Sequence, residues 1–273
     1  MAENQNKTTM ELGLNNKVMM VAASSKGLGF GIARQAALEG AVVSMGSRSK
    51  KNMNEALEQI RSELPDARVH GYSLDVADPG SVELWVHNTL HELGTIDGLV
   101  VNGGGPSPGM FDELEDSHWL AGYENTLMSA VRMIRLVLPE MRRKKSGSIL
   151  TITSSSIKEP IDNLLLSNVY RAGVTSLVKS LSFQLARHHI RINNLVPGLF
   201  DTDRLRELDL HNSGEWRISL ERVRKINFDK IPMGRYGDPE EFGKAAIFLL
   251  SEAASYVTGE TFIIDGGKMR TVW

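Results

Sequence analysis

Short apolar runs that alternate with helical segments constrain this chain more than any other sequence feature. The runs have the length of strands, and the segments between them have the spacing of helices. Apolar strands joined through helices are typical of a parallel sheet that is covered on both faces. The sequence therefore predicts a single-domain, doubly wound α/β fold with about seven strands. The predicted strands are 18–23, 41–45, 68–73, 99–101, 148–153, 191–196 and 261–264, and the predicted helices are 29–39, 51–63, 81–93, 117–143, 167–188 and 239–250.

Two segments fall outside this alternation. Residues 1–13 are mostly polar and predict a flexible N-terminal tail, which leaves 14–273 as the catalytic domain. Segment 201–237 is rich in charge, has helical spacing over 216–226, and is too long for an ordinary connection. It predicts a lid insertion. Its arginines either attract an acidic substrate or form a solvated helix face: Arg204, Arg206, Arg217, Arg222 and Arg224.

The composition excludes several classes of protein. The 273 residues include no cysteine, which removes disulfide scaffolds and thiol chemistry. The net charge of −2 disfavours a nucleic-acid or membrane binder that works by bulk charge. No apolar run approaches the roughly 20 residues of a membrane-spanning helix. The polar start, without an apolar signal core, predicts a cytoplasmic protein. No residue pattern indicates a metal site.

A glycine turn links the first predicted strand to the first predicted helix. It reads Ala23-Ser24-Ser25-Lys26-Gly27-Leu28-Gly29. Glycines at this place let a phosphate approach the helix N-terminus, as in the Rossmann dinucleotide fold. We therefore expect a dinucleotide site here. A tight turn without a ligand is the alternative.

The end of the second predicted strand indicates which dinucleotide binds. An NAD site carries an acid there, about 20 residues after the glycine turn. This chain instead has Ser47-Arg48-Ser49-Lys50-Lys51, and Lys26 adds a further cation. Because a guanidinium suits a phosphate better than a ribose hydroxyl, the sequence predicts NADP(H). Alternatively, Arg48 and Lys50 are solvated charges at a helix start.

Further motifs, in collinear order, resemble one family. Ala22-Ala23-x-x-x-Gly27-Leu28-Gly29 is similar to Thr-Gly-x-x-x-Gly-x-Gly, and Leu74-Asp75-Val76 is similar to an adenine-contacting segment. Val101-Asn102-Gly103-Gly104 resembles Asn-Asn-Ala-Gly, and Pro197-Gly198-x-x-x-Thr202 matches a motif on the nicotinamide side. Residues 15–268 thus resemble the short-chain dehydrogenase/reductase family, nearest to 3-oxoacyl-carrier-protein reductases and to sugar or alcohol dehydrogenases.

The resemblance carries expectations about the cofactor and the assembly. It implies a homotetramer with the helices 117–143 and 167–188 at one interface. It also implies a set of cofactor-binding residues: Ala23, Ser25, Lys26, Gly27, Leu28, Gly29, Ser47, Arg48, Asp75, Val76, Asn102, Gly103, Gly104, Arg171, Pro197, Gly198 and Thr202.

The catalytic positions depart from the family pattern. The family uses a Ser, a Tyr about thirteen residues later, a Lys four residues after that, and an Asn on the preceding helix. The corresponding residues here are Ser154, Ser167, Arg171 and Thr126. Arg171 can keep the positive charge but cannot shuttle a proton, and a serine is a far weaker acid than a phenol. The usual acid is therefore missing.

Two nearby residues are candidates to replace the acid. Tyr170 lies one helical turn after Ser167, although packing between helices is the alternative role. Lys158 follows the serine loop, although it is alternatively a solvent-facing lysine paired with Glu159. Catalytic candidates are therefore Ser154, Lys158, Ser167, Tyr170 and Arg171.

Three functions remain open from the sequence. The first is an NADP(H)-dependent oxidoreductase that interconverts a small carbonyl compound and its alcohol with an atypical proton donor. The second is an NADP(H)-binding sensor or subunit without redox turnover. The third is a lyase or isomerase that uses Lys158 and the serines on the same scaffold, because fold alone does not fix function.

Overall fold

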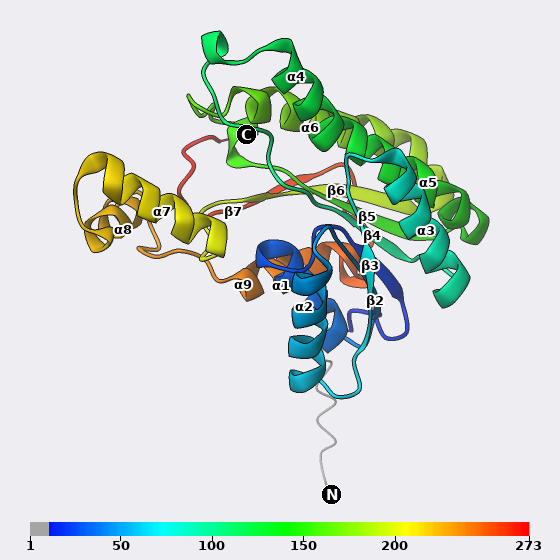
Figure 1. Ribbon diagram of the computed structural model, residues 1–273. Helices are drawn as coiled ribbons and strands as arrows, with labels where there is room; N and C mark the ends of the chain where they lie inside the picture. Colours follow the sequence, from blue (N-terminus) through cyan, green and yellow to red (C-terminus); the bar gives the residue numbers. More distant parts are fainter. Residues whose placement is uncertain (1–10, 273) are drawn as a thin grey trace, which may run out of the picture.

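One parallel sheet organises the chain. The structure is a computed structural model that describes residues 11–272. Within that range the strands form a seven-stranded sheet in the order β3-β2-β1-β4-β5-β6-β7, and every neighbouring pair is parallel (Figure 1). The predicted doubly wound sheet is confirmed. The strands are β1 Val18–Val21, β2 Val42–Ser47, β3 Arg68–Ser73, β4 Gly98–Val101, β5 Gly147–Ile152, β6 Ile190–Pro197 and β7 Thr261–Ile264.

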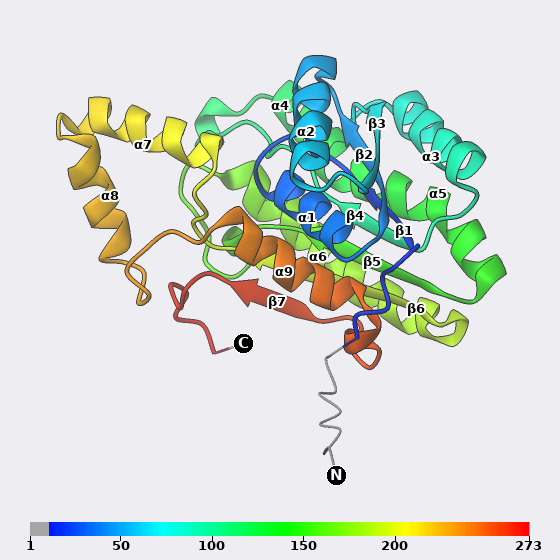
Figure 2. The ribbon, with the colours of Figure 1, turned by 90° about the horizontal axis from the view of Figure 1, so that it is seen from below.

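Helices cover both faces of the sheet. Figures 1 and 2 show α1, α2 and α9 on one face and α3, α5 and α6 on the other. Each face has its own apolar core, centred on residues such as Ile32 and Phe242 on one side and Trp85 and Met133 on the other. The helices are α1 Gly27–Leu38, α2 Lys50–Glu63, α3 Pro79–Leu93, α4 Asp116–Gly122, α5 Ser129–Lys144, α6 Leu165–Leu185, α7 Asp203–Trp216, α8 Leu220–Phe228 and α9 Pro239–Leu250.

Two predicted helices are wrong in detail. The predicted helix 117–143 is broken by a π-helical turn, η2 (Tyr123–Met128), between α4 and α5. A π turn shifts the hydrogen bonds by one residue and leaves the apolar spacing almost unchanged, so periodicity does not detect it. In the insertion, the predicted helix 216–226 corresponds to α8, which begins only at Leu220, and α7 was not predicted. Arg217 adopts a φ of 52° in the left-handed region, which ends α7.

The N-terminal segment lies only partly within the described residues. Residues 1–10 of the predicted tail fall outside them. Residues 11–13 contact the domain, because the Glu252 N–H donates to the Leu12 carbonyl at 3.0 Å and Leu12 packs on the core. Across residues 11–272, no helix has both the length and the apolar character needed to cross a bilayer.

Arg191 holds β6 to the end of α9. Its guanidinium donates to the carbonyls of Leu249 at 2.7 Å, Leu250 at 3.1 Å and Ser251 at 2.8 Å. These carbonyls end a helix and have no intrahelical partner. Burial lowers the pKa of Arg191, yet the group keeps its charge at neutral pH.

We expect Arg191→Met to lower the free energy of unfolding by about 2–4 kcal/mol, because several buried carbonyls lose a charged donor. Denaturant unfolding measures this change. Arg187→Met is the matched control, since Arg187 is exposed and, within residues 11–272, its side chain hydrogen-bonds to His188 alone. Equal stability of the two variants would contradict the assigned role of Arg191.

Candidate active site

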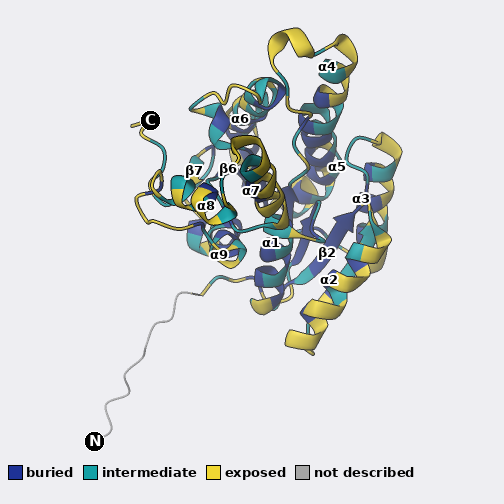
Figure 3. Ribbon diagram, turned by 60° about the vertical axis from the view of Figure 1, so that its left-hand side comes forward, coloured by how far each residue is buried: buried dark blue, intermediate teal, exposed yellow. Residues whose placement is uncertain are grey.

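The predicted site residues meet at the carboxyl edge of the sheet. Parallel strands end at the same edge, so the loops after β1, β2, β4, β5 and β6 lie together there. In Figure 3, α7 lies in front of this edge, between α1 and α6. The topology therefore brings together segments that are far apart in the sequence.

The glycine turn after β1 is closely packed. A Cβ at Gly29 would lie 2.3 Å from the Ala23 carbonyl oxygen and 2.8 Å from Asn102 Nδ2. That amide donates to the Ala22 and Ala23 carbonyls at 3.2 and 3.3 Å, which ties β4 to the turn. Ala23 has a φ of 48°, a conformation that favours glycine. This explains why the resembling family carries glycine at that position.

The ends of β1 and β2 form a cluster of hydroxyls and cations. Ser25 Oγ and Ser47 Oγ are hydrogen-bonded at 2.7 Å. Lys26 and Arg48, the residues that follow these serines, are exposed and form no ion pair with any described residue. Cations without a carboxylate partner, next to serine hydroxyls that can form further hydrogen bonds, suit a phosphate group. The residues present therefore fit an adenosine 2′-phosphate.

The adenine and ribose side of the predicted site is open. Val76 lies 3.7 Å from where a Cβ of Gly103 would be, and no atom lies within 4 Å of that position at Gly104. Asp75 is held by its neighbours, because its N–H donates to Ser81 Oγ at 2.9 Å and its carboxylate accepts the Ala77 N–H. The structure thus brings the loop after β3 next to the loop after β4.

The segment after β6 reaches back to the glycine turn. A Cβ at Gly198 would lie 2.5 Å from Asp265 Cα, so this turn must be glycine. Pro197 ends β6 just before it. Thr202 caps α7 by accepting the Leu205 N–H, and its methyl group lies 3.5 Å from the Cβ position of Gly27. The insertion therefore begins directly against the dinucleotide turn.

Arg171 brings a charge into the centre of this edge. Its Nη1 donates to the Ile152 carbonyl at 2.9 Å, at the end of β5. Burial, and secondly the charge of Arg204, lowers the pKa of Arg171 to about 10. The guanidinium therefore remains charged at neutral pH.

A small cavity of about 20 Å³, the size of one water, lies beside the Arg171 side chain. Asn102, Gly103, Gly104 and Thr126 also line it. Thr126 Oγ1 is buried without a hydrogen-bond partner among the described residues. An unpartnered hydroxyl next to a guanidinium leaves room for a polar ligand atom or a water.

The π turn η2 presents Thr126 to this cavity. Asn125 also lines the cavity, and its side-chain amide donates to the Ala121 carbonyl at 3.0 Å. Sequence reasoning identified Thr126 by alignment but not the π turn. Such turns often occur at functional sites.

Three serines surround the loop after β5. Ser154 caps the short helix η3 (Ser155–Ile157), and its Oγ accepts the Ser156 N–H at 3.2 Å. Ser156 Oγ and Ser167 Oγ are both buried and lie 3.4 Å apart. Ser156 was not singled out by the sequence, although the run of serines at 154–156 is a visible signal.

Tyr170 lies in helix packing. Its hydroxyl donates to the Trp119 carbonyl at 2.9 Å, and its ring meets Trp119 edge-on and also contacts Tyr123. Burial raises the pKa of Tyr170, and the electrostatic effect of the nearby Tyr123 hydroxyl raises it further. The structure thus places Tyr170 between α4 and α6, the alternative considered from the sequence.

Lys158 is exposed to solvent. The expected pairing with Glu159 is absent among residues 11–272, and the Glu159 carboxylate instead accepts the Arg270 N–H at 3.1 Å. The sequence placed these two residues together because they are neighbours in the chain. The chain turns at this point, so adjacency does not give contact.

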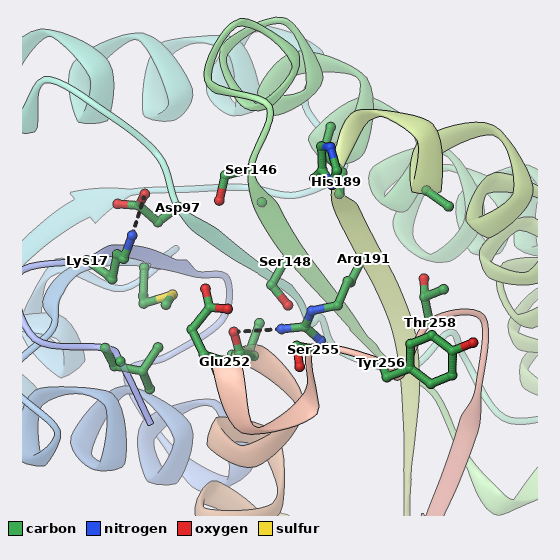
Figure 4. Close-up of a pocket in the computed structure, with 17 residues that line it drawn as sticks. Lys17, Asp97, Ser146, Ser148, His189, Arg191, Glu252, Ser255, Tyr256 and Thr258 are labelled. Carbon is green, nitrogen blue, oxygen red and sulfur yellow. Dashed lines mark hydrogen bonds and ion pairs between the residues drawn. The ribbon is translucent and has the colours of Figure 1, made fainter. Parts of the chain in front are cut away.

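A larger cavity of about 680 Å³ lies at the opposite, amino edge of the sheet (Figure 4). Three of its charged groups have partners within the fold, because Lys17 contacts Asp97 at 3.9 Å and Arg191 binds the end of α9. None of the predicted site residues lines it. The size of a cavity therefore does not identify the active site.

Comparison with known proteins identifies the family. The family model described as enoyl-(acyl carrier protein) reductase matches residues 22–268. The chain is 31% identical over 254 residues to the 3-oxoacyl-acyl-carrier-protein reductase of Chlamydia trachomatis, covering 93% of this chain and 98% of that one. This chain belongs to the short-chain dehydrogenase/reductase family. The resemblance drawn from the motifs is confirmed.

Solved structures of the family superpose closely on this one. L-sorbose reductase of Gluconobacter frateurii, complexed with NADPH and L-sorbose, is 29% identical with a TM-score of 0.92, over 96% of this chain and 100% of that one. A short-chain oxidoreductase of Pseudomonas aeruginosa, described as containing an atypical catalytic center, is 26% identical with a TM-score of 0.87, over 95% and 100%.

Proposed function

We propose that this protein is an NADP(H)-dependent oxidoreductase that interconverts a carbonyl compound and its alcohol without a tyrosine acid. The observation that carries the proposal is the guanidinium of Arg171, which lies with Thr126 and the glycine loop at the carboxyl edge of the sheet. The L-sorbose reductase structure with bound NADPH and the reductase relatives support the same activity.

The cofactor preference is proposed from the cations at the end of β2. Lys26 and Arg48 would bind the 2′-phosphate together with Ser25 and Ser47, whose hydroxyls already share a hydrogen bond. An acid that would bind the ribose 2′-hydroxyl of NAD is absent from the end of β2. Pro197, Gly198 and Thr202 would hold the nicotinamide half, and Asn102, Gly103 and Gly104 would lie against the cofactor's ribose.

In the mechanism that we propose, a serine hydroxyl binds the carbonyl oxygen and the Arg171 guanidinium stabilises its charge. A bound nicotinamide supplies or accepts the hydride. The Ser154 hydroxyl hydrogen is free to donate to the carbonyl oxygen, because its oxygen already accepts the Ser156 N–H. Arg171 then stabilises the negative charge that develops on that oxygen.

Ser167 would deliver the proton. It lies one helical turn before Arg171, on the same face of α6. Its hydroxyl lies 3.4 Å from the Ser156 hydroxyl, so a proton can pass between the two. The Pseudomonas aeruginosa relative described with an atypical catalytic center is a precedent for departure from the usual residues.

NADPH consumption with a panel of oxo esters, diones, keto sugars and oxo acids tests the proposed function. Ser154→Ala should lower kcat/KM by about 10²–10³-fold, because it removes the donor to the carbonyl oxygen. Lys158→Ala should change kcat/KM little, since Lys158 is exposed. Binding of NADPH without any oxidation would favour a sensor, and product formation without NADPH oxidation would favour a lyase or isomerase.

Tyr170→Phe should leave kcat and its pH profile unchanged while lowering stability by about 1 kcal/mol, because the hydroxyl donates to a backbone carbonyl of α4. Steady-state rates between pH 5 and 9, together with thermal unfolding, measure both effects. Loss of turnover in a folded Tyr170→Phe enzyme would show that the phenol is the acid after all.

We also propose a homotetramer. An apolar groove of about 470 Å³ runs along α5 and α6, the two helices expected at an interface. Its lining includes Val131, Ile134, Leu138, Leu177 and Leu181. Light scattering should give the mass of four chains, and a mass of one chain would contradict the proposal.

A further inference from the structure

Arg204 extends from the lid across the active-site edge. It lies in the first turn of α7, two residues after Thr202, which contacts the glycine turn. Its guanidinium lies against the loop after β4, with Nη2 3.3 Å and Nη1 3.5 Å from the position of a Cβ on Gly105. Glycine at position 105 leaves room for the guanidinium, because the Cβ of any other residue would lie tightly against it.

Arg204 also lies close to Arg171. The charge of Arg204 is one of the two causes that lower the pKa of Arg171. Arg171 lines a cavity with Gly103 and Gly104, and Arg204 lies against Gly105 of the same loop. Like charges in one region are unfavourable, and an anion bound beside them would offset the repulsion.

No described carboxylate neutralises Arg204. Its sequence neighbours Asp201 and Asp203 contact Arg206 instead, at 2.9 and 3.4 Å. The Arg204 side chain is exposed and takes part in no ion pair within residues 11–272. Arg206 and Arg224, by contrast, contact aspartates of the insertion.

Helix stability does not explain a cation at this position. The N-terminal turn of a helix carries partial positive charge, so Arg204 is unfavourable to α7 itself. The cofactor pyrophosphate would not neutralise it either, because that group belongs at the N-terminus of α1 beside Gly27. Arg204 lies beyond Gly103 and Gly104, against Gly105.

We propose that Arg204 binds a carboxylate of the substrate, and that this enzyme acts on oxo acids and the corresponding hydroxy acids. The inference rests on the proposed function. In the reductive direction, the hydride of NADPH adds to the oxo carbon, the C=O π bond breaks, and one proton joins the oxygen. The products are NADP⁺ and a hydroxy acid whose carboxylate is unchanged.

The first experiment measures binding and needs no turnover. The complex of the enzyme with NADPH is titrated with linear carboxylates of increasing length and with the matched amides, and quenching of NADPH fluorescence gives Kd. The wild type should bind carboxylates more tightly than amides. Arg204→Gln should weaken carboxylate binding by about 10–100-fold, the effect of losing a charged hydrogen bond, and should leave amide binding unchanged.

Arg206→Gln is the matched control. It removes the same charge from the same helix, but Arg206 is already paired with two aspartates. The control should therefore bind carboxylates like the wild type. An equal loss of carboxylate affinity in both variants would mean that only the net charge of the helix matters, and it would overturn the proposal.

The second experiment compares kcat/KM for an oxo acid and for its methyl ester. The ratio of acid to ester should fall about 10–100-fold in Arg204→Gln, with the Kd of NADPH unchanged. An unchanged ratio, or a weaker Kd for NADPH alone, would overturn the proposal and make Arg204 a cofactor ligand. Carboxylate selectivity without turnover of any carbonyl compound would instead uphold the binding site and contradict the proposed function.

Discussion

Arg171→Met is expected to lower kcat by about 10²–10³-fold while the protein stays folded. The guanidinium is the one charged group that lines the small cavity beside Thr126, and methionine keeps its bulk without its charge. Ground-state binding of a neutral carbonyl compound should change less, because the charge acts mainly on the developing oxyanion. Steady-state kinetics and circular dichroism measure the two effects.

The alkaline limb of the wild-type pH profile gives an independent check. Arg171 acts as a cation, and its pKa is lowered to about 10. Activity should therefore be fully present at neutral pH and decline as the pH rises through about 10. Arg171→Lys should retain part of the rate, because it keeps a charge but loses the planar donor set. Equal kcat in the wild type and Arg171→Met would remove Arg171 from the mechanism.

Arg48→Asp should reverse the preference between NADPH and NADH. The change removes a cation from the 2′-phosphate site and introduces the acid that binds a ribose 2′-hydroxyl. The loss of a charged contact and the new repulsion together should shift the ratio of the two dissociation constants by about 10³-fold. Fluorescence titrations with each cofactor measure the ratio.

Lys51→Asp is the control for that shift. It makes the same change in charge on the surface of α2, where Lys51 is exposed and contacts Glu55 at 3.9 Å. The ratio of dissociation constants should stay within about threefold of the wild type, since exposed charges are screened by salt. A large shift in this control would mean that the site responds to net charge only.

The sheet could be predicted from the sequence because strands and helices differ in periodicity. The predicted strands 68–73 and 261–264 coincide with β3 and β7, and the predicted helix 239–250 coincides with α9. The π turn at 123–128 could not be predicted, since one extra residue in a helical turn hardly alters the apolar pattern. The break between α7 and α8 depends on the left-handed backbone conformation of Arg217, and an arginine in the sequence does not indicate that conformation.

The candidate site followed from motif order more than from periodicity. Gly29 and Asn102 were expected to share a site, and Asn102 Nδ2 lies 2.8 Å from where a Cβ of Gly29 would be. Side-chain direction was beyond the sequence. Tyr170 and Arg171 are adjacent on α6, yet the phenol packs on α4 while the guanidinium faces β5. Arg204 was one of five equivalent lid arginines until the fold placed it over Gly105.

Transfer of deuterium from C4-deuterated NADPH tests most directly whether the enzyme transfers a hydride without a phenolic acid. The labelled cofactor is incubated with the carbonyl panel and either wild-type enzyme or Tyr170→Phe, and mass spectrometry reads the alcohol products. We expect one deuterium in the same product from both enzymes, at similar rates. Tight NADPH binding with no label in any product would contradict hydride transfer, and label transfer that disappears in Tyr170→Phe would show that the phenol is the acid.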